Sequence, residues 1–302
     1  MKIDNDHLTA FAAALSEGTF DLAARKLNVT PSAISQRIKL LEERIGKILI
    51  QRTTPCQVTE AGRPLLRYAE ELALLESEVL SELGVGDANN SSSLRVPIVV
   101  NADSLDSWFL DVFTALLDLP EITLDLRCED QDHSVALLRE GSVMAAVSAR
   151  SEVIQGCRVE LLGAMRFLAL AAPSYVDRYF ASGVNAETLA TAPHMRFNRK
   201  DALQQVFIAR LTDVALDPPK HYSPTTASFD EAIQRGLAWG MVPEQLASSS
   251  LKSGQLVQIA PEHYLDVPLF FHRLRLGSVS LETVSKLVRQ AARRSLRWPT
   301  DR

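Results

Sequence analysis

Three carboxylates stand where apolar stretches of the chain end. Asp103 follows the stretch 94–100, and Glu129 and Asp130 follow the alternating stretch 122–128. If these stretches are neighbouring parallel strands, the carboxylates meet at the edge of the sheet where α/β proteins bind ligands. A buried cation is costly unless it is paired, so carboxylates at this edge would recognise a cationic group. The expected chemistry is reversible binding of a small cationic molecule.

Hydroxyl and aromatic residues near the same edge suit the rest of such a ligand. An amino-acid carboxylate prefers the backbone N–H groups at the start of a helix, and Ser104, Thr225 and Thr226 lie where helices are expected to begin. An aromatic wall would cover the aliphatic part. The expected ligand contacts are Asn101, Asp103, Ser104, Glu129, Asp130, Ser148, Phe197, Asn198, Thr225, Thr226 and Trp239. In the alternative reading, Asp103 only caps its helix and the acids at 129–130 are solvated.

A second polar set lies on one helix near the N-terminus. Thr30 is a good N-cap and Pro31 suits the first helical position, which predicts a helix that ends before Gly46. Four residues share one face of it: Ser32, Ser35, Gln36 and Lys39. Small side chains, an amide and a cation are what a helix in the major groove of DNA needs. The alternative is a solvated face, but such faces usually include glutamate, which appears here only at Glu42 and Glu43.

Two short apolar stretches after Gly46 flank a turn, which predicts a β-wing beside this helix. Arg52 near the tip of the wing would reach the minor groove or a phosphate, and a solvated turn cation is the alternative. The expected DNA contacts are Thr30, Pro31, Ser32, Ser35, Gln36, Arg37, Lys39 and Arg52.

A long helix is predicted from about residue 59 to Leu83. Six of its residues alternate three and four apart: Leu65, Tyr68, Leu72, Leu75, Val79 and Leu83. Such spacing is typical of a helix that pairs with another helix, so we expect a dimer contact. A helix that packs only on its own domain is the alternative. The Gly-, Asn- and Ser-rich segment 84–93 predicts a flexible linker.

The remaining chain alternates predicted strands and helices, which favours an α/β body. We expect a helix over 104–117, a second α/β unit from about residue 166, and a returning strand from 268. The predicted fold is therefore a multi-domain α/β protein. Its expected parts are a winged helix-turn-helix domain (1–58), a linker or dimerisation helix with hinge (59–93), and an effector-binding domain (94–302) with lobe I (94–165 and 268–302) and lobe II (166–267).

Composition agrees with a DNA-binding module joined to a larger body. Residues 1–67 carry ten basic and seven acidic residues, whereas the rest of the 302-residue chain carries 22 and 30. We find no apolar run long enough to span a membrane and no secretory signal, and the three cysteines lie far apart. A cytoplasmic protein without membrane contact is expected.

The sequence gives little support for a catalytic function. The six histidines have no metal-binding spacing, and no nucleophile, phosphate-loop or dinucleotide motif occurs. We therefore expect no enzyme, no metal and no cofactor. Cys128 is expected to be a buried strand cysteine, because Glu129 and Asp130 beside it oppose an activated thiol.

The stretch from Phe20 to Gly62 resembles the winged helix-turn-helix of LysR-type transcriptional regulators, through its AARKL, TPSAISQRI, RT and TEAG elements. The length and the order of the domains extend this resemblance to the whole chain. Further segments resemble the ArgP/LysG branch, which senses basic amino acids: residues 100–104, 129–133, 138–141 and 236–241.

This resemblance implies a two-lobed effector domain like a periplasmic binding protein. It also implies a homodimer or tetramer on double-stranded promoter DNA, contact with RNA polymerase, and L-lysine or L-arginine as effector. The regulated gene would be an exporter of basic amino acids, and the regulator its activator. Three alternatives stay open: a LysR-type regulator of another small-molecule pathway, a replication- or nucleoid-related DNA-binding protein, and a solute-binding protein of a transporter.

Overall fold

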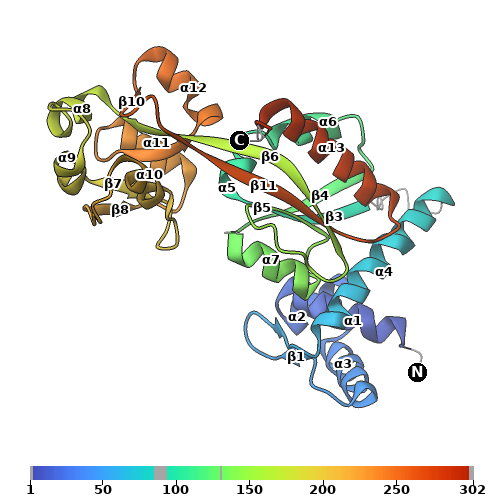
Figure 1. Ribbon diagram of the computed structural model, residues 1–302. Helices are drawn as coiled ribbons and strands as arrows, with labels where there is room; N and C mark the ends of the chain where they lie inside the picture. The colour runs from blue at the N-terminus through green and yellow to red at the C-terminus, as the bar shows by residue number, and fades with distance from the viewer. Residues whose placement is uncertain (1–2, 85–93, 130, 299–302) are drawn as a thin grey trace.

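Three helices and a small wing form the N-terminal domain of the computed structural model, which describes residues 3–84, 94–129 and 131–298 (Figure 1). These elements are α1 (Asn5–Glu17), α2 (Phe20–Lys26), α3 (Pro31–Ile45), β1 (Ile50–Gln51) and β2 (Gln57–Val58). The predicted start and end of α3 are confirmed. Thr30 caps the helix by accepting the N–H of Ala33, Pro31 is its first residue, and Gly46 ends it in the left-handed conformation.

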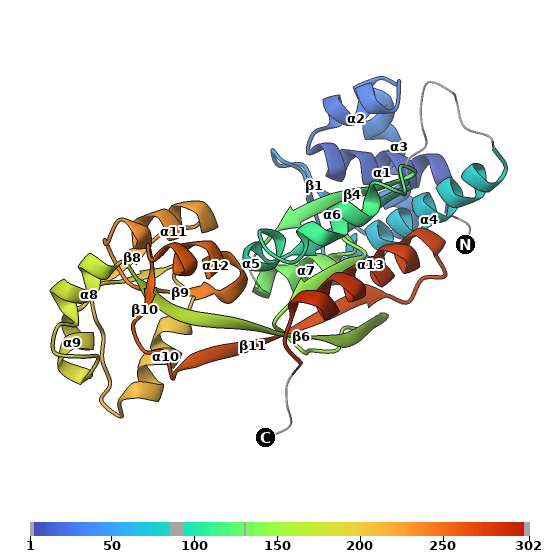
Figure 2. The ribbon, with the colours of Figure 1, turned by 90° about the horizontal axis from the view of Figure 1, so that it is seen from above.

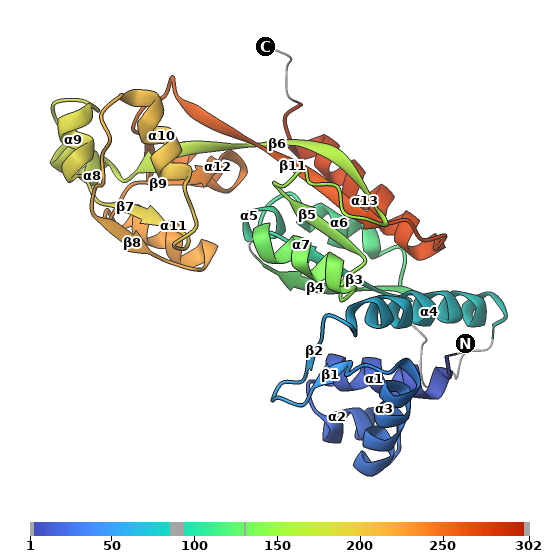
Figure 3. The same ribbon diagram turned by 60° about the horizontal axis from the view of Figure 1, so that its bottom comes forward.

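Helix α4 (Arg63–Glu82) has two buried faces, because it packs on both neighbouring domains. Leu65, Leu66 and Ala69 belong to the core of the N-terminal domain, whereas Leu74 belongs to the core of the α/β body. Figure 3 shows α4 lying between these two parts of the molecule. Helix α4 therefore connects the cores of the two parts.

A seven-stranded sheet runs through the α/β body in the order β10-β6-β11-β5-β3-β4, with β9 also paired to β6. Its strands are β3 (Leu94–Val100), β4 (Ile122–Cys128), β5 (Ala145–Ser148), β6 (Cys157–Ala171), β9 (Gly240–Pro243), β10 (Val257–Gln258) and β11 (Tyr264–Leu274). The strands β4, β3 and β5 are parallel, as the sequence predicted. A small parallel pair, β7 (His194–Arg196) and β8 (Lys220–Tyr222), lies in lobe II.

Two long antiparallel strands, β6 and β11, join the lobes (Figure 2). The sequence placed the lobe boundaries inside these strands and expected β6 to begin near residue 166, but it begins at Cys157. Gly163 of β6 lies beside a register shift and has a φ of +137°. A Cβ there would lie 2.8 Å from the Cβ of Leu296, so this close approach requires glycine.

Helices cover both faces of the lobe I sheet. In Figure 1, α6 (Leu110–Leu116) and α13 (Val279–Ser295) lie above it and α7 (Gln131–Glu140) lies below it. The single helix expected over 104–117 is wrong: α5 (Ala102–Leu105) and α6 are separate. Trp108 and Phe109, which lie in the turn between them, are both buried in the core of the α/β body.

Lobe II carries the remaining helices, which pack around β7, β8 and β9. They are α8 (Pro173–Tyr179), α9 (Ala186–Thr191), α10 (Leu203–Leu211), α11 (Thr226–Gln234) and α12 (Glu244–Ser253). Among the described helices, none is long and apolar enough to cross a membrane.

Candidate DNA interface and effector cleft

The predicted DNA-reading face of α3 is open to solvent. Ser32, Gln36 and Lys39 are exposed and Ser35 is half-buried. Arg52 of the wing lies beside this face: its Nη1 is 3.5 Å from the Ser35 Oγ, and its guanidinium lies 5.3 Å from the centre of the Phe20 ring. The structure thus brings the wing cation and the polar helix face together.

Two other predicted DNA contacts are engaged within the protein. Arg37 pairs with Asp6 of α1 at 3.2 Å, so its guanidinium lies against α1 and not with the polar set on α3. Because this pair is partly exposed, the DNA contact predicted for Arg37 stays a prediction. Lys39 pairs with Glu43 one turn along α3, at 3.6 Å and in an exposed position. Such a surface pair is weak, and a phosphate can replace the carboxylate.

A cleft of about 590 Å³ lies between the two lobes. This volume is in the range of small-molecule sites. Six of the predicted ligand contacts line it: Asn101, Asp103, Glu129, Phe197, Asn198 and Thr226. The side chains come from both lobes, so a ligand here would touch both.

Four predicted contacts do not line the cleft, and these predictions are corrected. Ser104, Ser148 and Trp239 are completely buried in the core, where Trp239 packs 5.7 Å from the ring centres of both His194 and Phe207. Thr225 caps α11 by accepting the N–H of Ser228. The strand-end rule identifies the edge of a sheet, but it does not tell which neighbouring side chain points into the core. Asp130 lies outside the described residues.

The cleft also contains residues that the sequence analysis missed. Asp201, Asp230, Arg150 and Lys200 add charge, and apolar walls come from Phe167, Met241, Pro243 and Val267. Asp230 had a signal, because it lies four residues after Thr226 on the same face of α11. No local pattern in the sequence predicts Asp201, because its position depends on the loop before α10.

Two carboxyl groups in the cleft have raised pKa values. Burial raises the pKa of Asp103 to about 7, and the neighbouring Asp201, Asp230 and Asp106 contribute to the shift. Burial, together with Asp106, raises the pKa of Asp230 to about 6. The Oδ1 of Asn101 is buried without a hydrogen-bond partner. Among the described residues, four carboxyl groups and two cations thus line the cleft, and burial disfavours the charged form of two of the four carboxyl groups.

Cys128 is exposed and lines the cleft, so the expectation of a buried cysteine is wrong. Partial burial raises the pKa of its thiol, and Asp106 and Glu129 raise it further. A raised thiol pKa lowers the thiolate fraction, which argues against a reactive cysteine. Among the described residues, no group of three or more histidine, cysteine or acidic side chains is arranged to hold a metal ion.

The predicted dimerisation stripe of α4 is open except at its start. Tyr68, Val79 and Leu83 are exposed, while Leu72 and Leu75 are half-buried. Leu65 is buried in the core of its own domain, so the prediction for Leu65 is corrected.

The face of α4 that packs on the α/β body is held by polar contacts. Glu78 accepts hydrogen bonds from Ser278 Oγ (2.6 Å), Ser280 N (2.9 Å) and Val279 N (3.3 Å) at the start of α13. Gly141 after α7 lies so close to Arg67 that a Cβ there would be 2.5 Å from the Arg67 Cα. These contacts fix α4 to the body of its own chain.

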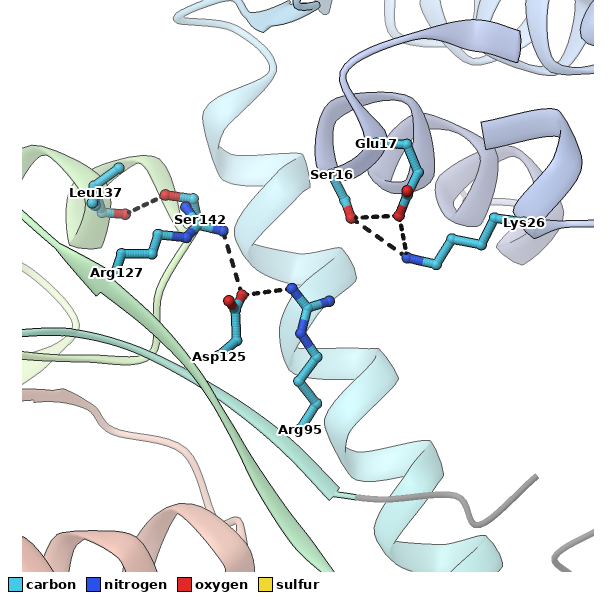
Figure 4. A network of polar contacts seen from close by, with 8 residues as sticks. All are labelled: Ser16, Glu17, Lys26, Arg95, Asp125, Arg127, Leu137 and Ser142. Atoms are coloured by element: carbon cyan, nitrogen blue, oxygen red, sulfur yellow. Dashed lines mark hydrogen bonds and ion pairs between the residues drawn. The ribbon is translucent and has the colours of Figure 1, made fainter. Parts of the chain in front are cut away.

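Ion pairs flank α4 nearby. Arg95 of β3 pairs with Asp125 of β4 at 2.5 Å, and Lys26 pairs with Glu17 at 2.7 Å in the N-terminal domain. Figure 4 shows both pairs beside the helix. Arg127 lies 3.8 Å from the same Asp125 carboxylate. Each of these pairs joins groups of one domain, so the pairs lie on the two sides of α4 without linking the domains.

Comparison with known protein families identifies the family of this chain. Residues 5–63 match the bacterial regulatory helix-turn-helix protein, lysR family, and residues 91–293 match the LysR substrate binding domain. The chain is a LysR-type transcriptional regulator. The predicted family, the predicted fold class and the DNA-binding role are thereby confirmed.

Relatives refine the branch of this LysR-type regulator. The regulator LysG of Mycobacterium tuberculosis is 45% identical over 96% of this chain and 94% of its own length. The lysine export transcriptional regulatory protein LysG of Corynebacterium glutamicum is 38% identical over 96% of this chain and 98% of its own length. The chain belongs to the LysG/ArgP branch, whose members are transcriptional regulators and not enzymes.

Solved structures agree with this placement. The crystal structure of ArgP from Mycobacterium tuberculosis has a TM-score of 0.86 and 44% identity, covering 98% of this chain and all of that one. Full-length LysG from Corynebacterium glutamicum with bound effector Arg has a TM-score of 0.77 and 36% identity, with the same coverage.

Proposed function

We propose that this regulator senses lysine or arginine in the inter-lobe cleft and activates a gene for the export of basic amino acids. The observation that carries the proposal is the excess of carboxyl groups over cations among the described residues that line the cleft: Asp103, Glu129, Asp201 and Asp230. The bound arginine of the LysG structure from Corynebacterium glutamicum gives independent support.

The cleft offers a matching group for each part of a basic amino acid. The side-chain cation would lie against Asp103 and Glu129, because a buried cation needs carboxylates. Phe197 would cover the aliphatic chain. The α-carboxylate would meet the side-chain amide of Asn198. Arg150 of lobe I and Lys200 of lobe II contribute positive charge to the lining of the cleft.

The remaining features fit a ligand-controlled promoter protein. Ser32, Ser35, Gln36, Lys39 and Arg52 would contact double-stranded promoter DNA, with Thr30 and Pro31 fixing the start of the reading helix. The exposed stripe of α4 would pair with a second copy in a homodimer or tetramer. Contact with RNA polymerase and a place in the cytoplasm follow from promoter activation. The domain limits 1–58, 59–93 and 94–302 belong to the same proposal.

DNA footprinting of the full-length protein, with and without ligand, tests this function. Double-stranded sites would be selected from a random library, and the protected length would be compared with no ligand, lysine, arginine or leucine. We expect lysine or arginine to change the protected length or the affinity, since lobe closure re-spaces the reading helices. Protection that no basic amino acid alters would contradict the proposal. It would favour a LysR-type regulator of another pathway or a nucleoid-related DNA-binding protein.

A further inference from the structure

Two helices carry acidic residues toward each other across the cleft. In lobe I, Asp103 of α5 and Asp106 at its C-terminal end lie three residues apart. In lobe II, Thr226 and Asp230 of α11 lie four residues apart. Both spacings place a pair on one helix face. The hydroxyl of Thr226 donates a hydrogen bond to the carboxylate of Asp106, so these two faces meet directly.

Asp103 and Asp230 are the unsatisfied members of this group. Within the described part of the chain, neither carboxylate accepts a hydrogen bond, and burial raises the pKa of both. Asp201 faces the same space, but its oxygens accept the backbone N–H groups of Phe197 (2.9 Å) and Leu203 (3.0 Å). The other charged groups lining the cleft are Glu129, Arg150 and Lys200.

Asp230 also differs from the acid that follows it on the same helix. Glu231 is exposed and pairs with Arg235 at 2.6 Å, which is an ordinary surface contact. Asp230 is half-buried and has no such contact among the described residues, although a charge that is partly removed from water is costly without a partner. A carboxylate that has this energetic cost and no partner in the protein is suited to bind a cationic ligand.

We propose that Asp230 of lobe II determines specificity together with Asp103 of lobe I, by sharing one cationic group of the ligand between the lobes. The two carboxylates repel each other across the cleft, and a cation between them converts this repulsion into attraction. A neutral ligand of the same shape cannot do so. This inference rests on the proposed function of the cleft, and it adds a contact from the second lobe.

A double-mutant cycle on the full-length protein tests the sharing. The variants are Asp103→Asn, Asp230→Asn and the double variant, with Glu231→Gln as the matched control on α11. Arginine is titrated by calorimetry. Each single change is expected to weaken arginine binding by about 10- to 100-fold, because a charge-assisted hydrogen bond is lost. The double change is expected to cost less than the product of the two, since both carboxylates hold the same group.

Three results would overturn this inference. They are unchanged arginine affinity in Asp230→Asn, strictly multiplicative effects in the double variant, and an equal loss in Glu231→Gln. The melting temperature of Asp230→Asn without ligand distinguishes a purely structural role, which would lower it, whereas removal of a buried unpaired charge does not. Asp230→Glu keeps the charge and should retain more affinity than Asp230→Asn. If the wild-type protein itself fails to bind arginine and lysine, the proposed function fails as well.

Discussion

Two carboxylates of the molecule, Glu78 of the linker helix and Asp103 of the cleft, have opposite surroundings. Glu78 accepts hydrogen bonds from backbone and hydroxyl groups at the start of α13. Burial alone would raise its pKa, but the hydrogen bonds from Ser278 and Ser280 bring the pKa below the ordinary value. Asp103 is buried beside other acids, and its pKa rises to about 7.

This difference in surroundings distinguishes an acid that stabilises the fold from an acid that is available to a ligand. A carboxylate whose acceptor sites are filled by the protein stabilises the fold in its charged form. A carboxylate that is removed from water without donors costs stability, and a cation beside it would offset this cost. Glu78 therefore joins α4 to the α/β body, while the proposed function assigns Asp103 to the ligand.

Neutralising Asp103 is expected to have the largest effect. Asp103→Asn should weaken arginine binding by up to about 100-fold, since it removes a charge-assisted contact from a buried site. Calorimetric titration measures this loss, and Asp118→Asn on the surface of the same lobe is the matched control. If the arginine affinity of Asp103→Asn stays within a factor of about two of the wild type, Asp103 does not bind the ligand and the contrast with Glu78 does not hold.

Removing the Glu78 carboxylate should act on stability instead. Glu78→Ala leaves the buried hydroxyls of Ser278 and Ser280 without their acceptor, and we expect a loss of about 2 kcal/mol in the free energy of unfolding. Denaturant unfolding measures it, with Glu82→Ala at the exposed end of α4 as the control. Equal stability of the two variants would show that this contact contributes nothing.

The pH dependence of ligand binding should follow the raised pKa values. Below about pH 7, Asp103 takes up a proton, and the neutral acid no longer attracts a cation. Arginine affinity should therefore fall roughly tenfold between pH 8 and pH 6. Titrations in buffers of different ionisation enthalpy should also reveal proton release on binding. In Asp103→Asn the dependence should largely disappear; its full persistence would assign the proton to another group.

Asp103 and Glu78 should make the free energy of unfolding, measured without ligand, change with pH in opposite directions. A group with a raised pKa stabilises the fold while it is protonated, and this contribution is lost as the pH rises through about 7 at Asp103. Glu78 has a lowered pKa, so its contribution is present above the unfolded-state pKa and is lost as the pH falls. Melting curves of Asp103→Asn and Glu78→Ala across pH separate the two signs.

Changes on the DNA face should leave both carboxylates unaffected and have the smallest effect. Lys39→Ala should weaken binding to all DNA sequences alike and reduce the salt slope by about one. Gln36→Ala should instead reduce discrimination between sites by about 1 kcal/mol. Anisotropy titrations at several salt concentrations distinguish these results. Unchanged DNA binding in both variants would mean that α3 faces DNA with another surface.

Local signals predicted the N-terminal domain well. The Thr30–Pro31 start and the Gly46 end define α3, because capping depends on neighbouring residues alone. The strand-end rule likewise predicted Asp103 and Glu129 in the cleft. Both features follow from short stretches of sequence.

Long-range packing decided what the sequence analysis did not predict. Trp239 was expected in the cleft but packs in the core of lobe II, and Leu65 of the expected dimer stripe packs inside its own domain. The length of β6 and β11 depends on their pairing with each other across about a hundred residues. Asp230 lies four residues after Thr226 on α11, but its place in the cleft depends on how the two lobes face each other.

Calorimetric comparison of arginine with citrulline tests the central claim most directly. Citrulline has nearly the same shape as arginine but carries no charge on its side chain, so only the cationic group differs. The account predicts saturable binding of arginine to the full-length protein and at least about a hundredfold weaker binding of citrulline. Equal binding of the two would contradict the claim that the acids of the cleft select a cation.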